Sequence, residues 1–280
     1  MIATEFRFDL KTRSACFELV PLFDLHYGCE SCNISKLKET IQYIKSRPNC
    51  RFYLGGDMIE GINMSDKRFA LETVESNYRK DLMNLAYAQI DGLYNLLKPI
   101  ADKCLFLLEG NHELTVKNRY YFDACSVMAE KLKVSNFEHS ALIRFCFTSS
   151  KTMTKEWILF TEHGHGAGRK IGAKIGSIVA VGEGVEADAY IMGHNHGKAH
   201  VCQPRIHIGG HTPRIIEKEK TYVLAGSYKK TYAPESTYGE RAGYLPVSLG
   251  SLSLQIYPFL CERREGKPVN MPVRVKVNTL

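Results

Sequence analysis

The chain has 280 residues, of which 44% are hydrophobic and 24% are charged, which is the balance of a folded globular protein and excludes a disordered one. No apolar run approaches the roughly 18 residues that a membrane-spanning helix needs, and the first residues lack the basic and apolar segments of a signal peptide. The formal net charge of +7 permits a polyanionic partner without indicating one.

The organisation of the chain predicts one domain in a reducing compartment. No repeat, low-complexity tract or Gly/Ser linker divides residues 1–280, so we expect a single domain. The nine cysteines are an odd number, and the one Cys-x-x-Cys, Cys29 to Cys32, has no second pair at zinc-ribbon spacing. We therefore expect reduced thiols and a cytoplasmic location.

Short apolar β-type runs alternate with helical periodicity over residues 16–200. The predicted strands are, in chain order, residues 16–23, 51–54, 105–108, 157–161 and 189–192. Apolar residues at helical spacing follow the first four strands, at residues 37–44, 71–85, 122–132 and 171–178, and the second of these helices should end before Pro99. This alternation is typical of βαβ units and of a largely parallel, buried sheet.

The helical period disappears beyond about residue 200. Apolar and polar residues alternate over residues 252–256 and 273–277, which predicts half-buried strands, and we expect residues 201–280 to complete a second sheet. Residues 226–243 are rich in Gly, Tyr and Lys and are predicted to form an ordered surface loop. The whole pattern predicts an α/β fold with two mixed β-sheets flanked by helices.

A polar cluster follows each of the five strands predicted before residue 200. The clusters are Asp24-Leu25-His26, Gly55-Gly56-Asp57-Met58-Ile59-Glu60, Glu109-Gly110-Asn111-His112-Glu113, Glu162-His163-Gly164-His165 and Gly193-His194-Asn195-His196. Ligands bind outside the carboxyl ends of the strands in open α/β sheets, so we expect the five clusters to converge on one edge. Six of the ten histidines lie in these clusters, which five unrelated turns would not produce.

The side chains in these clusters indicate a metal centre. Carboxylate oxygens, imidazole nitrogens and an amide oxygen, with no thiolate, suit Mn²⁺, Fe, Zn²⁺, Co²⁺ or Ni²⁺, and we expect Mn²⁺ first among them. The donors are too many for one ion. Two divalent ions roughly 3.5–4 Å apart would use them all if one carboxylate bridges the ions.

The order of the motifs resembles that of the calcineurin-like metallophosphoesterase superfamily. Asp-x-His, Gly-Asp-x-x-Glu, Gly-Asn-His-Glu, a His-Gly at a strand end and Gly-His-x-His follow one another between Asp24 and His196. The layout is most similar to the DNA-repair exonuclease and phosphodiesterase branches. The resemblance implies a four-layer α/β/β/α sandwich, in agreement with the pattern of strands and helices.

The resemblance also implies a role for each residue of the motifs. It places Asp24, His26 and His196 on one metal ion and Asn111, His163 and His194 on the other, with Asp57 bridging both and His112 near the leaving group. Asp57, Asn111 and His112 are therefore the candidate catalytic residues. The fourth motif offers a second candidate ligand, His165; we prefer His163 because it lies at the strand end beside a glycine.

Two-metal chemistry then predicts the reaction. A hydroxide bridging the ions attacks phosphorus in line, and Asn111 and His112 offset the negative charge that develops on the phosphoryl oxygens. His112 protonates or hydrogen-bonds the departing oxygen. Glu60 and Glu113 either support His112 from behind or lie exposed at the surface, and the sequence leaves this open.

Phosphodiesters are the expected substrates, with DNA and RNA among them. The protein Ser/Thr phosphatase branch carries Asp-Arg-Gly where this chain has Ile59-Glu60-Gly61, which disfavours that branch. Basic residues and tyrosines that could bind nucleic acid, or could simply form a solvated loop, are Arg169, Lys170, Lys174, Tyr228, Lys229, Lys230, Tyr232, Tyr238, Arg241 and Tyr244. The alternatives are a phosphomonoesterase acting on nucleotides or phosphoproteins, and a non-catalytic, metal-stabilised binding subunit. We expect no membrane partner, and the sequence leaves the oligomeric state open.

Overall fold

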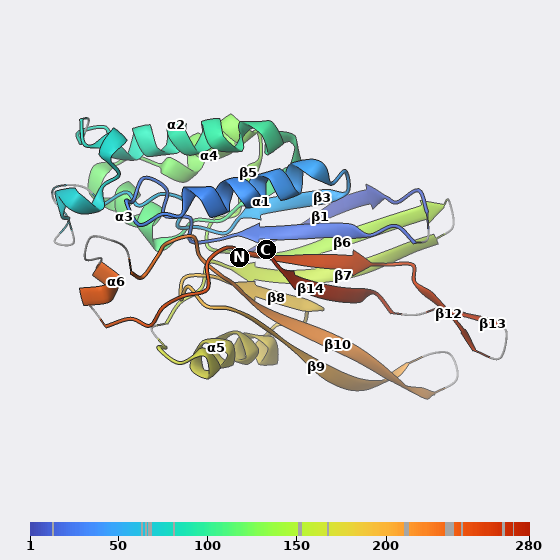
Figure 1. The fold of residues 1–280 in the computed structure, drawn as a ribbon. Helices are drawn as coiled ribbons and strands as arrows, with labels where there is room; N and C mark the ends of the chain where they lie inside the picture. Colours follow the sequence, from blue (N-terminus) through green and yellow to red (C-terminus); the bar gives the residue numbers. More distant parts are fainter. Residues whose placement is uncertain are drawn as a thin grey trace.

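The structure is a computed structural model that describes residues 1–12, 14–62, 64, 66, 69–80, 82–150, 153–166, 168–209, 213–232, 238–241, 243–264, 267–270 and 272–280. Two six-stranded sheets lie face to face (Figure 1). The first sheet has the order β1 (Ile2–Asp9), β6 (Ser140–Ser150), β7 (Met153–Glu162), β8 (Ala189–Met192), β10 (Arg214–Ala225), β9 (Lys198–Gly209). The second has the order β14 (Arg274–Thr279), β11 (Leu252–Tyr257), β2 (Phe17–Leu22), β3 (Cys50–Leu54), β4 (Cys104–Leu107), β5 (Ser135–Asn136).

Helices cover the outer faces of both sheets. The second sheet is covered by α1 (Ile34–Ser46), α2 (Leu85–Leu97) and α4 (Ala124–Leu132), and the first by α5 (Ile171–Gly184), as Figure 1 shows. The remaining elements are α3 (Asn111–Tyr120), α6 (Tyr238–Arg241), the β12 (Cys261–Arg264)–β13 (Lys267–Asn270) pair and 3₁₀ turns at Leu71–Thr73, Ser76–Tyr78 and Lys98–Lys103. The layers are therefore α/β/β/α, and both sheets mix parallel with antiparallel pairs, as predicted.

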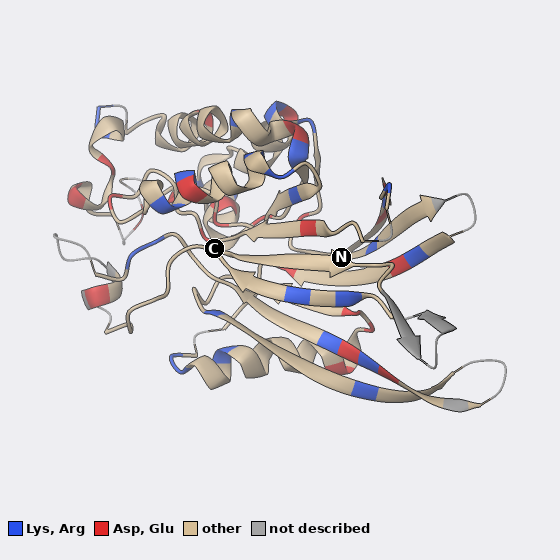
Figure 2. Ribbon diagram, turned by 45° about the vertical axis from the view of Figure 1, so that its right-hand side comes forward, with Lys and Arg blue, Asp and Glu red and all other residues tan. Residues whose placement is uncertain are grey.

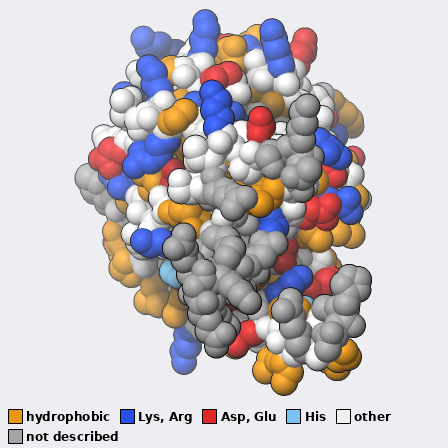
Figure 3. All heavy atoms as spheres, turned by 90° about the vertical axis from the view of Figure 1, so that its right-hand side faces the viewer, with side chains coloured by type: hydrophobic (Ala, Val, Ile, Leu, Met, Phe, Trp, Pro, Cys, Tyr) orange, Lys and Arg blue, Asp and Glu red, His pale blue; other side chains and the backbone are white. Residues whose placement is uncertain are grey.

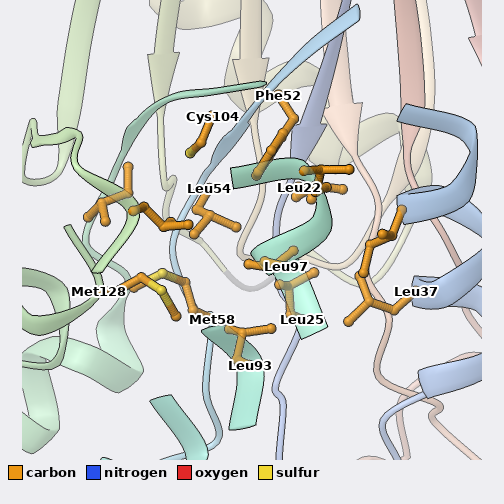
Figure 4. Close-up of a cluster of buried hydrophobic side chains, with 14 of the residues drawn as sticks. Leu22, Leu25, Leu37, Phe52, Leu54, Met58, Leu93, Leu97, Cys104 and Met128 are labelled. Carbon is orange, nitrogen blue, oxygen red and sulfur yellow. The ribbon is translucent and has the colours of Figure 1, made fainter. Parts of the chain in front are cut away.

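The sequence of β2, apolar except for Glu18, reflects burial on both faces. Val20 and Leu22 pack against the helices of the second sheet, whereas Phe17 and Leu19 pack between the two sheets. A strand covered on both sides has no polar face, so alternation is absent from its sequence. Figure 4 shows the helix side of this core, where Leu22 lies among leucines of α1 and α2.

The prediction of a long helix over residues 71–85 is wrong. This segment forms two 3₁₀ turns, and α2 begins only at Leu85 and ends at Leu97, before Pro99. Between the turns, Val74 makes an antiparallel bridge with Cys29, and the Glu75 N–H donates to the Gly28 carbonyl at 3.0 Å. Pairing with the loop after β2 holds this backbone extended, so its apolar spacing does not produce a helix.

The strands of residues 201–280 divide between the sheets instead of all lying in the second one. β10 joins the first sheet because it pairs in parallel with β8, with Thr221 opposite Ala189, and β9 pairs along its whole length with β10. β11 and β14 extend the second sheet beside β2. The predicted loop at residues 226–243 contains α6; its residues 233–237 and 242 lie outside the described part of the chain.

Charge is distributed over the molecule without a dominant face in the view of Figure 2, where acidic and basic residues are interspersed over helices and strands. Ile206, Ile208 and Ile215, near the tip of the β9–β10 hairpin, are 74–77% exposed. Figure 3 shows this end of the sandwich, with hydrophobic side chains among lysines and arginines. None of the helices in the described part of the chain combines the length and apolar composition needed to cross a membrane.

Candidate metal centre

The five polar clusters meet at one edge, where β2, β3, β4, β7 and β8 end. The seven predicted ligands all lie there: Asp24, His26, Asp57, Asn111, His163, His194 and His196. Because the parallel strands of each sheet end on the same side, residues far apart in the chain come within contact distance. This convergence is what the motif spacing predicted; the role of these residues as ligands remains a prediction.

The first group of donors contains Asp24, His26 and His196, whose ligand atoms all lie within 4.8 Å of one another. The Nε2 atoms of His26 and His196 face each other at 3.1 Å. His196 Nε2 lies 3.8 Å from Asp24 Oδ1, and His26 Nε2 lies 3.8 Å from Asp57 Oδ2. Two ring nitrogens turned toward each other beside two carboxylates suit a shared cation.

The second group contains Asp57, His163 and His194, again within 4.8 Å. Asp57 Oδ1 lies 3.5 Å from His163 Nε2. Asn111 Oδ1 lies 3.2 Å from His163 Nε2 and 2.8 Å from His194 Nδ1. The two carboxylate oxygens of Asp57 thus face different groups, Oδ2 the first and Oδ1 the second, which is the arrangement of a bridging ligand.

The surroundings of the Asp24 carboxylate indicate whether a cation fits at this edge of the sheets. Its side chain is fully buried, and neither carboxylate oxygen has a hydrogen-bond partner within the described residues. Burial raises the pKa of Asp24 well above its usual range, although His163 opposes the shift. A buried carboxylate without a donor is costly, and a metal ion supplies the missing charge, so the residues present fit a metal.

The histidines differ in charge because their surroundings differ. Burial, together with Lys229, lowers the pKa of His26 to about 4, and burial holds that of His196 well below its usual value. Both rings are therefore neutral at pH 7, the form that can bind a metal. Burial also opposes charge on His163, but Asp57 beside it raises the pKa of His163 to about 10, so these two form an ion pair in the metal-free protein.

The ligand loops turn sharply. Left-handed backbone with positive φ occurs at five of the seven predicted ligands, Asp24 (50°), His26 (46°), Asp57 (48°), His194 (61°) and His196 (53°). Such a conformation is unfavourable for residues other than glycine and concentrates at functional sites. It turns consecutive side chains of one short loop toward the same centre.

Glu113 holds two of these loops together. It is buried, and its carboxylate accepts hydrogen bonds from the N–H groups of Asp57 at 2.9 Å, Ile59 at 3.1 Å and Gly110 at 3.0 Å. A Cβ at Gly110 would lie 2.2 Å from the Asp57 nitrogen, so only glycine allows this approach. Glu113 is therefore neither exposed nor a support for the His112 ring; it fixes the loop that carries Asp57.

His112 lies beside both donor groups. Its main-chain N–H donates to Asp57 Oδ1 at 2.9 Å, and its ring packs edge-on against His26 with centroids 4.7 Å apart. Its Nδ1 donates to the main-chain carbonyl of Glu60, because a carbonyl can only accept. Nε2 is therefore the ring nitrogen that remains for a substrate.

His165 lies outside the centre. Its side chain is 68% exposed, and its nearest acidic contact is Glu162, 3.6 Å away. His163, by contrast, is buried and donates from Nδ1 to the Gly55 carbonyl at 2.9 Å, which turns Nε2 toward Asp57. Of the two histidines of the fourth motif, the geometry favours His163.

A pocket of about 760 Å³ opens over the centre. Its wall includes five of the seven predicted ligands, all but Asp24 and His163, together with His112, the start of α5 and residues 229–231 and 244–248. The basic residues in the wall are Arg169, Lys174, Lys198, Lys229 and Lys230. Sequence reasoning grouped Lys229 with a surface loop and missed its place beside the centre, because the strand before it, β10, was not predicted.

The two sheets, the helices that cover them and the loops at one edge form the four-layer α/β/β/α sandwich that the motifs implied. No family model and no curated protein matches the chain. Vps29 of Chaetomium thermophilum is similar at 9% identity and a TM-score of 0.37, over 94% of this chain and 98% of that one.

Two further solved structures are similar. A predicted phosphoesterase of Streptococcus pneumoniae is 12% identical, with a TM-score of 0.32, over 86% of this chain and 83% of that one. The nuclease MPE of Pseudomonas putida is 9% identical, with a TM-score of 0.34, over 85% of this chain and 82% of that one.

Proposed function

We propose that the protein is a metal-dependent phosphoesterase that hydrolyses phosphodiester bonds with two divalent cations. The observation that carries this proposal is the position of Asp57, whose two carboxylate oxygens face two separate groups of donors. Asp24, His26, His196 and Asp57 would hold one ion, and Asp57, Asn111, His163 and His194 the other. The donor types favour Mn²⁺, with Fe, Zn²⁺, Co²⁺ and Ni²⁺ as alternatives.

Two bound cations would lower the pKa of a water molecule and offset the charge of the phosphoryl oxygens. The chain's own contribution to leaving-group departure is His112. With Nδ1 donating to the Glu60 carbonyl, an imidazolium at His112 has one N–H left, on Nε2, for the departing ester oxygen. This fixed orientation supports a role as general acid.

The basic residues of the pocket favour a diester over a monoester. Lys229 is paired with Glu60, Lys174 donates to the Asn195 carbonyl, and Lys198 donates to the Leu249 carbonyl. At least these three of the five cations in the wall are thus engaged by the protein, and the charge of Lys229 is balanced by that of Glu60, which weakens the clamp that a dianion would need. A volume of about 760 Å³ accommodates a ligand of nucleotide size, so nucleic acid is one substrate class.

The test is hydrolysis of bis(p-nitrophenyl) phosphate with added Mn²⁺. We expect turnover by the wild type and none by Asp57→Ala, with circular dichroism confirming that the variant is folded. Asp123→Ala removes a carboxylate that caps α4 and contacts Ser126 and Lys117, neither of which is a predicted ligand; it is the control and should keep activity.

Parallel rates on p-nitrophenyl phosphate separate the alternatives. Faster turnover of this monoester than of the diester would favour the phosphomonoesterase. No turnover of either ester with any of the five metals, while metal raises the melting temperature, would favour the non-catalytic binding subunit.

A further inference from the structure

A largely buried ion pair, Glu60 with Lys229, lies in the pocket wall beside the predicted ligands. Glu60 is only 7% exposed, and Lys229 Nζ lies 2.7 Å and 2.8 Å from its two carboxylate oxygens. Burying two charges is costly, and the pair gains stability only where further hydrogen bonds satisfy the carboxylate. The further partner of Glu60 is a predicted ligand.

Glu60 Oε2 lies 2.9 Å from His26 Nδ1. Lys229 Nζ donates to both carboxylate oxygens of Glu60, so the group forms an ion pair and, as a carboxylate, can only accept. Nδ1 of His26 therefore carries the hydrogen. The other ring nitrogen, Nε2, is left with its lone pair directed toward His196 and Asp57, at 3.1 Å and 3.8 Å.

The main chain of the same residue orients a second histidine. The Glu60 carbonyl accepts from Nδ1 of His112, whose ring packs edge-on against His26. Glu60 thus fixes both imidazoles at Nδ1 and leaves both Nε2 atoms for the centre. The side chain serves the predicted ligand and the main chain serves the leaving-group histidine.

Lys229 reaches Glu60 from a segment that also supports the first ligand loop. Ser227 Oγ and the Tyr228 N–H both donate to the Asp24 carbonyl at 3.0 Å. Lys229 forms an isolated bridge with Cys32, which follows the same loop. Residues 227–229 therefore tie the end of β10 to the loop of Asp24 and His26, and bring the ammonium group to Glu60.

We propose that Glu60 is a positioning residue of the metal centre: its carboxylate holds His26 in the tautomer that binds a cation through Nε2, and Lys229 anchors that carboxylate. This inference rests on the proposed function, because it requires His26 to be a ligand. It differs from a purely structural role, in which the pair would stabilise the fold without affecting the metal.

The principal variant is Glu60→Gln, which keeps the shape of the side chain and removes its charge. Mutation of a residue that hydrogen-bonds a ligand from behind typically lowers metal affinity 10- to 100-fold, and here Gln replaces an acceptor-only carboxylate with an amide that also donates. We expect a loss of this size in Mn²⁺ affinity, measured by isothermal titration calorimetry. We also expect kcat for the diester to fall while KM stays within about twofold.

Glu18→Gln is the matched control. Glu18 is also a buried carboxylate, 5% exposed, and it pairs with Arg47 and Tyr43 on the helix side of β2, away from the centre. We expect this variant to lower the melting temperature and to keep the Mn²⁺ affinity of the wild type. The double variant Glu60→Gln/Lys229→Met should bind Mn²⁺ no more weakly than Glu60→Gln alone, because Lys229 acts through Glu60.

A measurement on the wild type keeps the inference testable if Glu60→Gln does not fold. The imidazole nitrogen resonances of the metal-free protein should identify His26 as the Nδ1–H tautomer, and an Nε2–H tautomer would overturn the inference. So would a folded Glu60→Gln with wild-type Mn²⁺ affinity while the wild type hydrolyses the diester. A wild type that binds no metal would instead overturn the proposed function, and this inference with it.

Discussion

His112 lines the pocket and contacts Asp57 only through its main chain. A positioned acid contributes about 10²–10⁴ in rate, so we expect His112→Gln to lower kcat for the diester by that factor. The Mn²⁺ affinity, measured by calorimetry, should remain that of the wild type because the ring is not a predicted ligand. If His112→Gln lowers kcat by less than tenfold, His112 is not the acid that protonates the leaving group.

The Asp24 carboxylate should destabilise the metal-free protein and at the same time be needed for metal binding. Its buried carboxylate oxygens have no partner within the described residues. Replacing a buried, unpaired charge with a neutral amide removes part of its desolvation cost. We expect Asp24→Asn to raise the free energy of unfolding of the metal-free protein by about 1 kcal/mol, as measured by urea denaturation.

The same variant should respond less to metal. A ligand at 100 times its Kd stabilises the folded state by about 2.7 kcal/mol, and Asp24→Asn should need a higher Mn²⁺ concentration for that gain. The wild type in chelator is the reference. An unchanged Mn²⁺ response together with an unchanged metal-free stability would contradict the proposed role of Asp24.

Much of the candidate site could be predicted from single residues. Asp24, Asp57 and His194 each come two or three residues after the end of a strand, so knowing the strand places the side chain near its carboxyl end. Glu60 and Lys229 could not be paired in the same way. Their contact depends on β10 lying beside β8, and no local pattern in residues 214–225 indicates that neighbour.

At the scale of the element, the sequence pattern predicted a strand or helix correctly where the spacing of apolar residues matches the residues that are buried. The strand at Ala189–Met192 has the predicted bounds because all four residues are buried. α3, which begins at Asn111, was not predicted, since only His112, Glu113 and Val116 of its ten residues are buried. Its position comes from the loop that it continues and not from an apolar face.

The N-cap of α4 yields a prediction with a pH dependence. Asp123 accepts from the Ser126 N–H at 2.9 Å and pairs with Lys117 at 3.0 Å. Partial burial opposes charge, but these two partners outweigh it and lower the pKa of Asp123 below its usual value of 3.8. The ionised carboxylate therefore stabilises the fold above that pH, and the contribution is lost as pH falls through the lowered pKa.

Two substitutions distinguish the contribution of the hydrogen bond that caps α4 from the contribution of the negative charge on Asp123. Asp123→Ala should lower the free energy of unfolding by about 1 kcal/mol at pH 6.5, whereas Asp123→Asn, which keeps an acceptor, should lose only about 0.3–1 kcal/mol. The deficit of Asp123→Asn should shrink as pH falls below about 4. Urea denaturation at a series of pH values checks this, and a deficit that grows toward acid pH would contradict it.

At the scale of the whole molecule, the four-layer sandwich could be predicted but the assignment of strands to sheets could not. Alternating strands and helices require parallel sheet covered by helices. β1 and β6, however, pair in parallel across more than 130 residues of sequence, and β9 and β10 extend the same sheet from the other edge. Such long-range pairing depends on packing between the sheets, where Phe145 and Val223 lie in one core.

The most direct measurement is an anomalous difference map from a crystal of the wild type soaked in Mn²⁺. We predict two peaks roughly 3.5–4 Å apart, one among Asp24, His26 and His196 and one among Asn111, His163 and His194, with a carboxylate oxygen of Asp57 on each. A single peak away from Asp57, or no peak at this edge, would contradict the claim that these loops form a two-metal centre.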